Sequence, residues 1–456
     1  MSRDMSVIVV GGGVAGIAAA LVLAEAGARV TLLETRKKLG GRATSFEDVR
    51  TGLVIDNCQH VSLGCCTNYL DFCRRLGVAE KIRWLREIYW VEAGGRTSVM
   101  RPGALPAPGH FSASFLAASF LTAAEKLAVG VAMNAALVAR REEWKGRTFG
   151  EWLAAHRQPA GAVEKFWCPV VVSACNLEPA RVSAASALHV FQEGFLAHKD
   201  AAAMGVSSVP LVELYDPAER AVEASGGCVR LGASVARIGE RDVTLGSGER
   251  LEADAVICAV PPERAARMVD AEVRARDARF EAMSRVEHSP ILGVHLRFDR
   301  AVLPFHSAVL VARPTQWVFR KDGAGEQVHA VISGAEEWMG LDETEITRRV
   351  MDDIGACFPG AEGARVLSSR PVKEKLATFA PTPAVEALRP TTRGASAVIL
   401  AGDFVQTGWP ATMEGAARSG YMAAAAALGM DERAFVRPSL RPGVLVRSLA
   451  PHLARA

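Results

Sequence analysis

The N-terminal region alternates apolar runs and glycines in an order that predicts a βαβ unit. Residues 5–34 read MSVIVVGGGVAGIAAALVLAEAGARVTLLE. An apolar run precedes three glycines, a helix of small apolar residues follows them, and a second apolar run ends at Glu34. Short apolar runs next to glycine turns are typical of buried strands, and the unit has the length of a strand, a helix and a second strand.

Further buried strands are predicted in two distant segments. Residues 226–238, GGCVRLGASVARI, place a strand after a glycine turn, and residues 241–262 predict a hairpin followed by a buried strand. Near the C-terminus, AVILAGD at 397–403 predicts a last buried strand before a helix of small residues.

The remaining segments predict a second region with a different pattern. Residues 76–224 are mostly helical by pattern. Residues 290–394 alternate strands such as ILGVHLRF and VHAVISG with one amphipathic helix from Asp342 to Cys357.

One stretch of the helical region raises the question of a membrane. Residues 102–124 contain no Lys, Arg, Asp or Glu, but three prolines and Gly109 interrupt them, so a transmembrane helix is not expected. A second helix is predicted after Glu125, with an apolar stripe formed by Leu127, Val131, Ala135 and Val138. Residues 105–138 are therefore either a buried helical pair, which the composition favours, or an apolar hairpin that dips into one leaflet. For the tail, residues 431–456, a short membrane-surface helix and a disordered end both remain open.

The composition excludes some classes of protein. The 53 basic and 50 acidic side chains give a formal net charge of +3 without long single-sign blocks, so nucleic acid is not an expected partner. Nine scattered cysteines fit free thiols in a reducing cytosol. Cys58, Cys65, Cys66 and Cys73 lack paired C-x-x-C spacing, so no metal site is expected. No signal-peptide core precedes the first strand, so a cytoplasmic location is expected.

The glycines after the first strand form a G-x-G-x-x-G pattern. Gly11 permits the tight turn, Gly13 lets a pyrophosphate approach backbone N–H groups, and Gly16 lets the helix lie against the strand. Glu34 can accept hydrogen bonds from both ribose hydroxyls of an adenosine. The whole unit predicts a dinucleotide site.

The segment after Glu34 adds a second phosphate contact. In ETRKKLGGRATSF, Gly40 and Gly41 precede Arg42, whose side chain can clamp a phosphate from the side opposite to the helix. A solvated basic turn is the alternative interpretation, since three other basic residues lie in the same loop.

These motifs carry a resemblance to a known group. The βαβ unit, the Glu34-to-Arg42 stretch and GDFVQTGWPATMEGAARSG at 402–420 together resemble the flavin amine oxidase, protoporphyrinogen oxidase and phytoene desaturase superfamily. The resemblance implies FAD and an α/β fold with a discontinuous Rossmann-type FAD-binding domain. That domain would comprise residues 5–75, 225–289 and 395–430. An α+β substrate domain, with a mixed sheet and helices around a tunnel, would comprise residues 76–224 and 290–394.

The same resemblance implies roles for single residues. Asp403 would hydrogen-bond the ribityl or pyrophosphate region, and Val235 would contact the adenine. The N–H groups of Thr412 and Met413 would face the flavin N1 and C2 carbonyl, where negative charge builds on reduction. Trp409 would either cap the turn or form a wall beside the flavin. The full set of expected cofactor-binding residues is Gly11, Gly13, Val14, Ala15, Gly16, Glu34, Gly41, Arg42, Gln59, His60, Val235, Gly402, Asp403, Trp409, Thr412 and Met413.

Within the superfamily, DNCQHVSLGCCTN at 56–68 and TGWPATMEGAARSG most resemble the squalene-associated hydroxysqualene dehydroxylases, although Cys58 stands where glycine is commoner. The resemblance implies a reaction of squalene and hopanoid biosynthesis, in which an allylic hydroxyl leaves hydroxysqualene as water and reduced flavin delivers hydride. An electron donor, unknown from the sequence, must reduce the flavin. A phytoene-type desaturase is the alternative enzyme, and a flavin-binding lipid carrier is the alternative outside enzymes.

An acid must help the hydroxyl group leave. His60 is the first candidate, with Asp56 or Gln59 orienting it, but His60 could instead only pack against or bond the flavin. His189 and Glu193, four residues apart on a predicted helix, are the second choice, and a surface pair is the favoured interpretation of these two. Because a long isoprenoid partitions into lipid, we also expect peripheral attachment to the cytoplasmic face of the inner membrane through residues 105–138.

Overall fold

The computed structural model describes residues 5–454 and contains a five-stranded parallel sheet in the order β10-β2-β1-β14-β20. Its strands come from three distant parts of the chain: Ser6–Val10 (β1), Arg29–Glu34 (β2), Cys228–Leu231 (β10), Ala255–Cys258 (β14) and Ile399–Leu400 (β20). β1 is central, and Val9 pairs with Leu32 on one side and with Ile257 on the other. The discontinuous α/β domain expected from the sequence is confirmed.

Two helices of small residues pack against each other beside this sheet, α1 (Val14–Glu25) and α15 (Met413–Ala427). A Cβ atom on Gly420 would lie 2.3 Å from the Ala15 carbonyl oxygen, and one on Gly16 would lie 1.8 Å from that of Gly11. Larger residues would push the helices away from each other and from the turn after β1. The close packing therefore depends on glycine at both positions.

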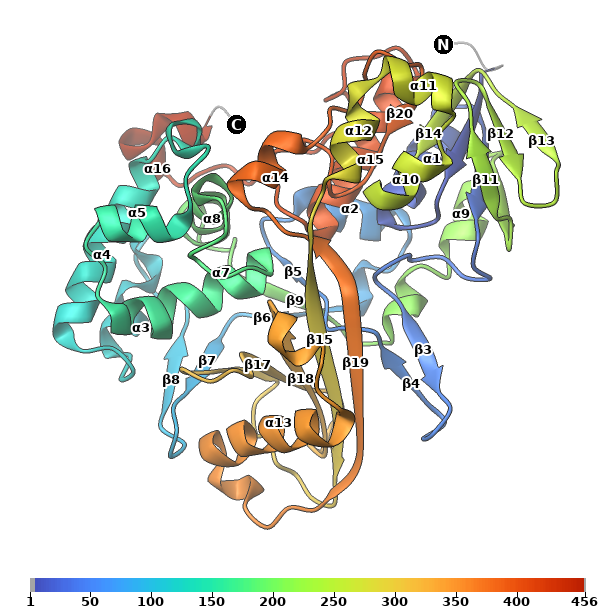
Figure 1. Ribbon diagram of the computed structural model, residues 1–456. Helices are drawn as coiled ribbons and strands as arrows, with labels where there is room; N and C mark the ends of the chain where they lie inside the picture. Colours follow the sequence, from blue (N-terminus) through green and yellow to red (C-terminus); the bar gives the residue numbers. More distant parts are fainter. Residues whose placement is uncertain (1–4, 455–456) are drawn as a thin grey trace.

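An antiparallel meander and three short helices complete this part of the molecule, at the upper right of Figure 1. The strands β12 and β13 form the hairpin predicted at 241–262, and β11 carries Val235. The elements are Val235–Ile238 (β11), Asp242–Leu245 (β12), Arg250–Glu252 (β13), Pro262–Met268 (α10), Ala271–Arg276 (α11) and Ala278–Ser284 (α12).

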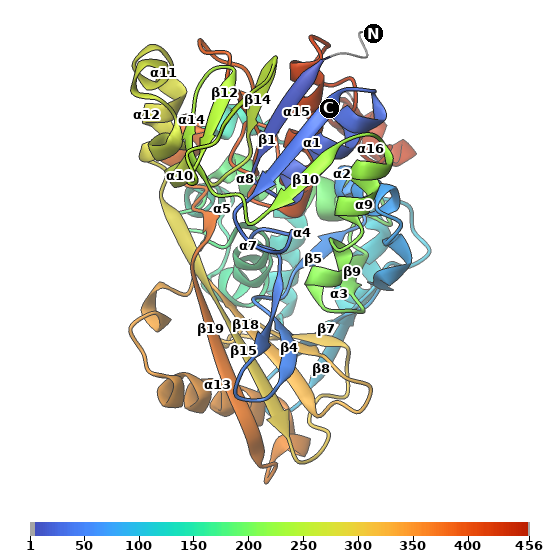
Figure 2. The same cartoon turned by 90° about the vertical axis from the view of Figure 1, so that its right-hand side faces the viewer.

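A mixed seven-stranded sheet in the order β19-β15-β18-β17-β16-β7-β8 forms the lower part of the molecule (Figure 1). Its strands are Ile88–Val91 (β7), Thr97–Met100 (β8), His288–Phe298 (β15), Ser307–Leu310 (β16), Trp317–Arg320 (β17), Gln327–Ser333 (β18) and Val366–Phe379 (β19). The long strands β15 and β19 run upward from this sheet to the parallel-sheet domain in both views (Figures 1 and 2). Helix α13 (Glu343–Cys357) follows its N-cap Asp342, which confirms the predicted amphipathic helix, and it packs Ile346, Val350 and Ile354 in the core against the sheet.

The mostly helical prediction for residues 76–224 missed four strands. β7 and β8 belong to the seven-stranded sheet, and β6 (Ile82–Leu85) and β9 (Met204–Ser207) form a three-stranded sheet with β5 (Val61–Leu63). Each of the four is only four residues long, so its pattern is too short to separate from a helical turn. β6, β7 and β9 pair with strands far along the chain, and β8 pairs with β7, so pairing determines their structure instead.

The helices between these strands form a bundle, at the left of Figure 1. They are Ser112–Ala117 (α3), Ala123–Val138 (α4), Phe149–Ala155 (α5), Cys168–Cys175 (α7) and Ala184–Phe191 (α8), with the short α6 (Ala160–Ala162). Trp152 and Trp167 are completely buried in its core, and Phe149 stacks on Trp152 at 5.3 Å between ring centroids. In the tail, the helix α16 (Val444–Leu449) packs beside α4.

The outer face of α3 and α4 exposes apolar side chains. Leu116, Leu127 and Val131 are 65%, 71% and 61% exposed. The residues of α4 that face the core are Val129, Ala132, Ala136 and Leu137, so the stripe predicted to be apolar faces outward for the most part, and the buried-pair interpretation of it is wrong. No helix among residues 5–454 is long and apolar enough to cross a bilayer.

The remaining elements connect these parts. They are the hairpin Ser45–Asp48 (β3) and Leu53–Asp56 (β4), and the helices Thr67–Arg75 (α2), Ala218–Ala224 (α9) and Pro383–Leu388 (α14).

Candidate active site

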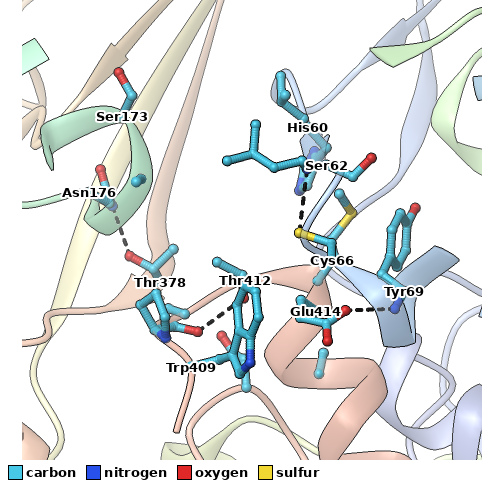
Figure 3. A pocket seen from close by; sticks show the side chains of 18 of the residues that line it. His60, Ser62, Cys66, Tyr69, Ser173, Asn176, Thr378, Trp409, Thr412 and Glu414 are labelled. Atoms are coloured by element: carbon cyan, nitrogen blue, oxygen red, sulfur yellow. Dashed lines mark hydrogen bonds between the residues drawn. The ribbon is translucent and has the colours of Figure 1, made fainter. Parts of the chain in front are cut away.

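A cavity of about 990 Å³ begins at the carboxyl ends of the parallel strands and continues between the seven-stranded sheet and the helical bundle. This edge of a parallel sheet is where doubly wound folds bind their ligands. Figure 3 shows side chains from distant parts of the chain around it, among them His60 and Cys66 before α2, Asn176 after α7, and Thr412 at the start of α15.

The glycine turn after β1 forms one end of the cavity. Gly11 has a φ of +109°, and a Cβ atom there would lie 2.7 Å from the Ala259 carbonyl oxygen, so the turn requires glycine. Gly13 is the N-cap of α1 and supplies no side-chain acceptor for the first N–H groups of that helix. Together with Val14 and Ala15 it lines the cavity, which makes this helix end a site for an anion.

Glu34 lies at the end of β2 and lines the same end of the cavity. Its carboxylate accepts hydrogen bonds from the N–H groups of Gly12 at 2.7 Å and Arg36 at 2.8 Å. These two bonds fix its position, and its remaining lone pairs can accept ribose hydroxyls. Val235 on β11 is buried and also lines this region.

Arg42 and Asp403 come from opposite ends of the chain and form a direct ion pair at the cavity. The Arg42 guanidinium also donates to the Ala377 carbonyl at 3.1 Å. Gly41 approaches Gly13 so closely that a Cβ on Gly41 would lie 2.9 Å from the Gly13 Cα. The loop that carries Arg42 therefore lies directly against the helix end that is suited to a phosphate.

The start of α15 forms the opposite wall. Thr412 is the N-cap, and its hydroxyl accepts a hydrogen bond from the Gly415 N–H at 3.1 Å. Met413 is the first residue of the helix, and the positive end of the helix dipole faces the cavity. Trp409 is buried and contacts the edge of His189 at 4.6 Å between ring centroids, so its side chain forms part of the wall.

Arg389 was not identified from the sequence, yet it organises the loop before α15. Its buried guanidinium donates to the carbonyl oxygens of Phe404, Asp403, Val405 and Trp409 at 2.6–3.2 Å. Arginine is suited to this work because it carries five donors in a fixed plane. A lone arginine outside any motif gives no signal for such a role in the sequence.

His60 lines the cavity opposite α15 (Figure 3). Its Nδ1 atom lies 3.1 Å from the Cys58 carbonyl oxygen, which can only accept, so Nδ1 carries the proton and Nε2 is left as an acceptor. Burial lowers the pKa of His60. A neutral ring that already donates its one N–H is poorly arranged to protonate a leaving hydroxyl.

Neither of the residues expected to orient His60 contacts its ring. Asp56 lies outside the cavity lining and accepts hydrogen bonds from Lys321, Ser45 and the Leu211 N–H at 2.7–2.9 Å. Gln59 does line the cavity, and its amide bonds the His60 backbone carbonyl and Lys321. The orienting role of Asp56 is therefore wrong, because its carboxylate is occupied in tying β4 to other parts of the chain.

His189 and Glu193 are not a surface pair. Both are buried, at 5% and 7% exposure, and both line the cavity. The sequence pattern could not show this, since a polar pair one turn apart is typical of an exposed helix face. Here that face is turned toward Trp409 and the start of α15.

The other end of the cavity is apolar and belongs to the helical bundle and the seven-stranded sheet. Its lining residues include Phe111, Phe115, Met133, Leu137, Phe166, Val170, Phe191, Phe195, Ile291, Trp317, Phe319 and Val331. Within the described part of the chain, no group of His, Cys, Asp and Glu side chains is placed to bind a metal ion.

Comparison with known proteins identifies the family. The family model for flavin containing amine oxidoreductases matches residues 14–428. The chain belongs to this family. As an amine oxidoreductase-family protein it binds FAD, and the residues described above fit that cofactor: a glycine-lined helix end for the pyrophosphate, a fixed carboxylate for the ribose, and a second helix end for the flavin ring. When bound, FAD supplies the transfer of a hydride to or from a substrate carbon.

Relatives whose reactions are named match almost the whole length of this chain. A hydroxysqualene dehydroxylase from Sinorhizobium fredii is 28% identical over 93% of this chain and 98% of its own. A 15-cis-phytoene desaturase from Synechococcus elongatus is 25% identical over 96% of this chain and 99% of its own. The structure of putrescine oxidase covers 93% of this chain and 99% of its own, with a TM-score of 0.70 at 17% identity, and so shows the same fold. The chain is an FAD-dependent oxidoreductase of this family.

Proposed function

We propose that the protein removes the hydroxyl group of hydroxysqualene by reductive dehydroxylation, with hydride from reduced FAD. The observation that carries this proposal is the continuity of the cavity, which joins the FAD-binding residues to a long apolar end. An apolar tunnel of aromatic and aliphatic side chains suits a long isoprenoid and offers little to a charged amine. The similarity to the Sinorhizobium fredii hydroxysqualene dehydroxylase supports the same substrate.

Phytoene-type desaturation is the second candidate. The desaturase relatives match this chain at 24–25% identity, close to the value for the dehydroxylase. Both reactions use the same cavity, but a desaturase starts from oxidised FAD and a dehydroxylase from reduced FAD. A flavin-binding lipid carrier has less support, because the chain belongs to an oxidoreductase family.

The direction of the reaction separates the two enzymes in a single turnover without oxygen. Photoreduced protein is mixed with hydroxysqualene, the absorption of oxidised FAD is followed, and the products are extracted. Return of that absorption together with squalene is the expected result. Inert reduced protein, together with oxidised protein that bleaches on addition of phytoene, would establish the desaturase instead.

We further propose that the protein attaches to the membrane surface through helices α3, α4 and α16. Their exposed apolar side chains, which we call the apolar patch, are Leu105 ahead of α3 together with Leu116, Leu127, Val131, Val138, Val444, Leu445 and Leu449. These helices lie on one side of the molecule in Figure 1, and α16 packs beside α4. Exposed apolar patches of this kind mark interaction sites.

The position of the patch relative to the cavity supports a lipid surface as the partner. Phe115 of α3 and Met133 and Leu137 of α4 line the cavity, while Leu116 and Leu127 of the same helices face outward. A substrate dissolved in the bilayer would thus meet the two helices that border the tunnel and avoid passage through water. Exposed Arg140 and Arg441 next to the patch suit the anionic head groups of a cytoplasmic leaflet.

A further inference from the structure

A buried cluster of charged side chains lies on the wall of the cavity beside Trp409. His189 lies near the C-terminal end of α8, and Glu193 lies in the π-helical turn Gln192–Leu196 that follows this helix. Turns of this kind are rare and often occur at functional sites, because they turn a side chain out of the regular helical face. The π-helical turn brings Glu193 to the same cavity as Trp409.

Arg141 connects the two side chains. Its guanidinium contacts the Nδ1 atom of His189 directly and approaches the Glu193 Oε1 atom at 3.8 Å, beyond hydrogen-bond distance. Since a guanidinium can only donate, Nδ1 of His189 is the acceptor and its Nε2 carries the proton. Among the described residues this Nε2 has no hydrogen-bond partner, although His189 is almost completely buried.

The charged and titratable groups that act on Glu193 come from several elements: Arg141 at the start of the short helix 141–144, Arg418 on α15, and Cys65 ahead of α2. Burial raises the pKa of Glu193, while Arg141 and Arg418 oppose that rise. The carboxyl group is thus protonated more readily than an ordinary glutamate, and two nearby cations stabilise the anion that it becomes after losing its proton.

We propose that Glu193 is the proton donor to the departing hydroxyl group, which makes it a catalytic residue of the proposed dehydroxylation. In this step the O–H bond of the Glu193 carboxyl group breaks and its proton goes to the substrate hydroxyl. The C–O bond then breaks, water leaves with the bonding electron pair, and the allylic carbon is left as a cation. The hydride that completes the reaction comes from reduced FAD. The inference rests on the proposed function, since only a hydroxyl substrate needs this proton.

Two other groups in the cavity are less suited to the role. His60 already donates its N–H to the Cys58 carbonyl. Glu414 is buried and accepts a hydrogen bond from the Tyr69 N–H at 2.8 Å (Figure 3). Its other oxygen accepts one from the Asn68 amide at 2.7 Å, so both oxygens are engaged. Among residues 5–454 no backbone N–H donates to the Glu193 carboxyl group, and Arg141 stabilises its anion in addition to Arg418, which also acts on Glu414.

Glu193→Gln tests the proposal, with Glu143→Gln as the matched control because Glu143 is an exposed carboxylate close to Arg141 and outside the cavity. In anaerobic single turnovers with hydroxysqualene, Glu193→Gln should be slower by about 100-fold or more, the usual contribution of general acid catalysis, with FAD content unchanged. An acyl ester of hydroxysqualene, whose carboxylate leaves without a proton, should react equally fast in the wild-type protein and in Glu193→Gln. The assignment would be overturned if Glu193→Gln reacted with hydroxysqualene as fast as the wild-type protein, or if its rate fell as much with the ester as with the alcohol. Loss of FAD from Glu193→Gln would also overturn it.

Two further measurements follow the protonation of Glu193, and the first of them uses only the wild-type protein. The single-turnover rate should fall as pH rises through the raised pKa of Glu193. The infrared carbonyl stretch of the protonated Glu193 carboxyl, identified by its absence from Glu193→Gln, should persist to a higher pH than that of an ordinary glutamate. A rate that does not fall with pH, or a Glu193 carboxyl that ionises at the pH of an ordinary glutamate, would overturn the role of Glu193 while leaving dehydroxylation intact. A wild-type protein that is inert toward hydroxysqualene would overturn the proposed function and this inference together.

Discussion

The apolar patch offers a direct test of membrane attachment. A triple variant, Leu116→Gln, Leu127→Gln and Val131→Gln, replaces three exposed apolar side chains by glutamine, a polar residue with a high helix propensity. Because these side chains already face solvent, their loss should leave the folded core unchanged. Any decrease in vesicle binding would then report the patch itself.

The exposure of the three side chains sets the size of the effect. They are 65%, 71% and 61% exposed in the protein, so about two thirds of each is available for burial in lipid. Complete burial of a Leu or Val side chain is worth about 1.5–3 kcal/mol, which gives about 1–2 kcal/mol for each and about 3–6 kcal/mol for the three. At about 1.4 kcal/mol for each factor of ten, the partition coefficient should fall by about 100-fold or more.

The assay is co-sedimentation with vesicles that contain anionic lipid, at several lipid concentrations. The matched control carries the same change at exposed apolar residues of other elements, Val49→Gln, Val54→Gln and Leu367→Gln. The control should bind like the wild-type protein. Equal binding of all three proteins, or a wild-type protein that stays in the supernatant, would refute membrane attachment through this surface.

Four further outcomes are expected. Arg42→Ala should lower FAD affinity through loss of a charge-assisted phosphate bond worth about 1.5–3 kcal/mol, measured by equilibrium dialysis, and unchanged affinity would reduce Arg42 to the partner of Asp403. Arg389→Ala should lower the free energy of unfolding by about 3 kcal/mol or more and release FAD, because the substitution leaves several buried carbonyl groups unpaired. Thermal unfolding with and without added FAD measures the loss of stability and the loss of FAD binding. Burial raises the pKa of Glu414 from 4.5 to about 7, so the free energy of unfolding should fall by about 3 kcal/mol as pH rises from below 4.5 through about 7. Urea titrations at several pH values measure this fall, and Glu414→Gln should abolish it. A variant whose stability depends on pH as in the wild-type protein would contradict the assignment to Glu414. His60→Ala should weaken FAD retention yet keep the pH dependence of the single-turnover rate, because the neutral ring is not the proton donor.

Much of the cofactor site could be predicted because it depends on short local patterns. The glycines after β1, the acid at the end of β2 and the cap of α15 each act through backbone geometry within a few residues, so the sequence shows them directly. The helix at Glu343–Cys357 was predictable for the same reason, since its cap and its apolar stripe are local.

The residues that were missed depend on contacts between distant segments. Whether Glu193 faces solvent or a cavity is decided by Trp409, which lies far along the chain, and no periodicity in the helix records that contact. Asp56 was misjudged because its partner Lys321 comes from the loop after β17. The orientation of α4 was misjudged because the helix carries apolar residues on both faces, so its own pattern does not show that Val129, Ala132, Ala136 and Leu137 are the ones that face the bundle.

The packing of α1 against α15 also limits when the protein can acquire its cofactor during synthesis. The helix end that receives the pyrophosphate is made first, but β20 and α15, which complete the parallel sheet and the opposite wall, are made only after the whole of the seven-stranded sheet and the helical bundle. Until then the small apolar side chains of α1 lack the helix that covers them, and a chaperone has an exposed segment to bind. FAD can therefore meet a complete site only after α15 has been made, so cofactor binding finishes folding and does not guide its first steps.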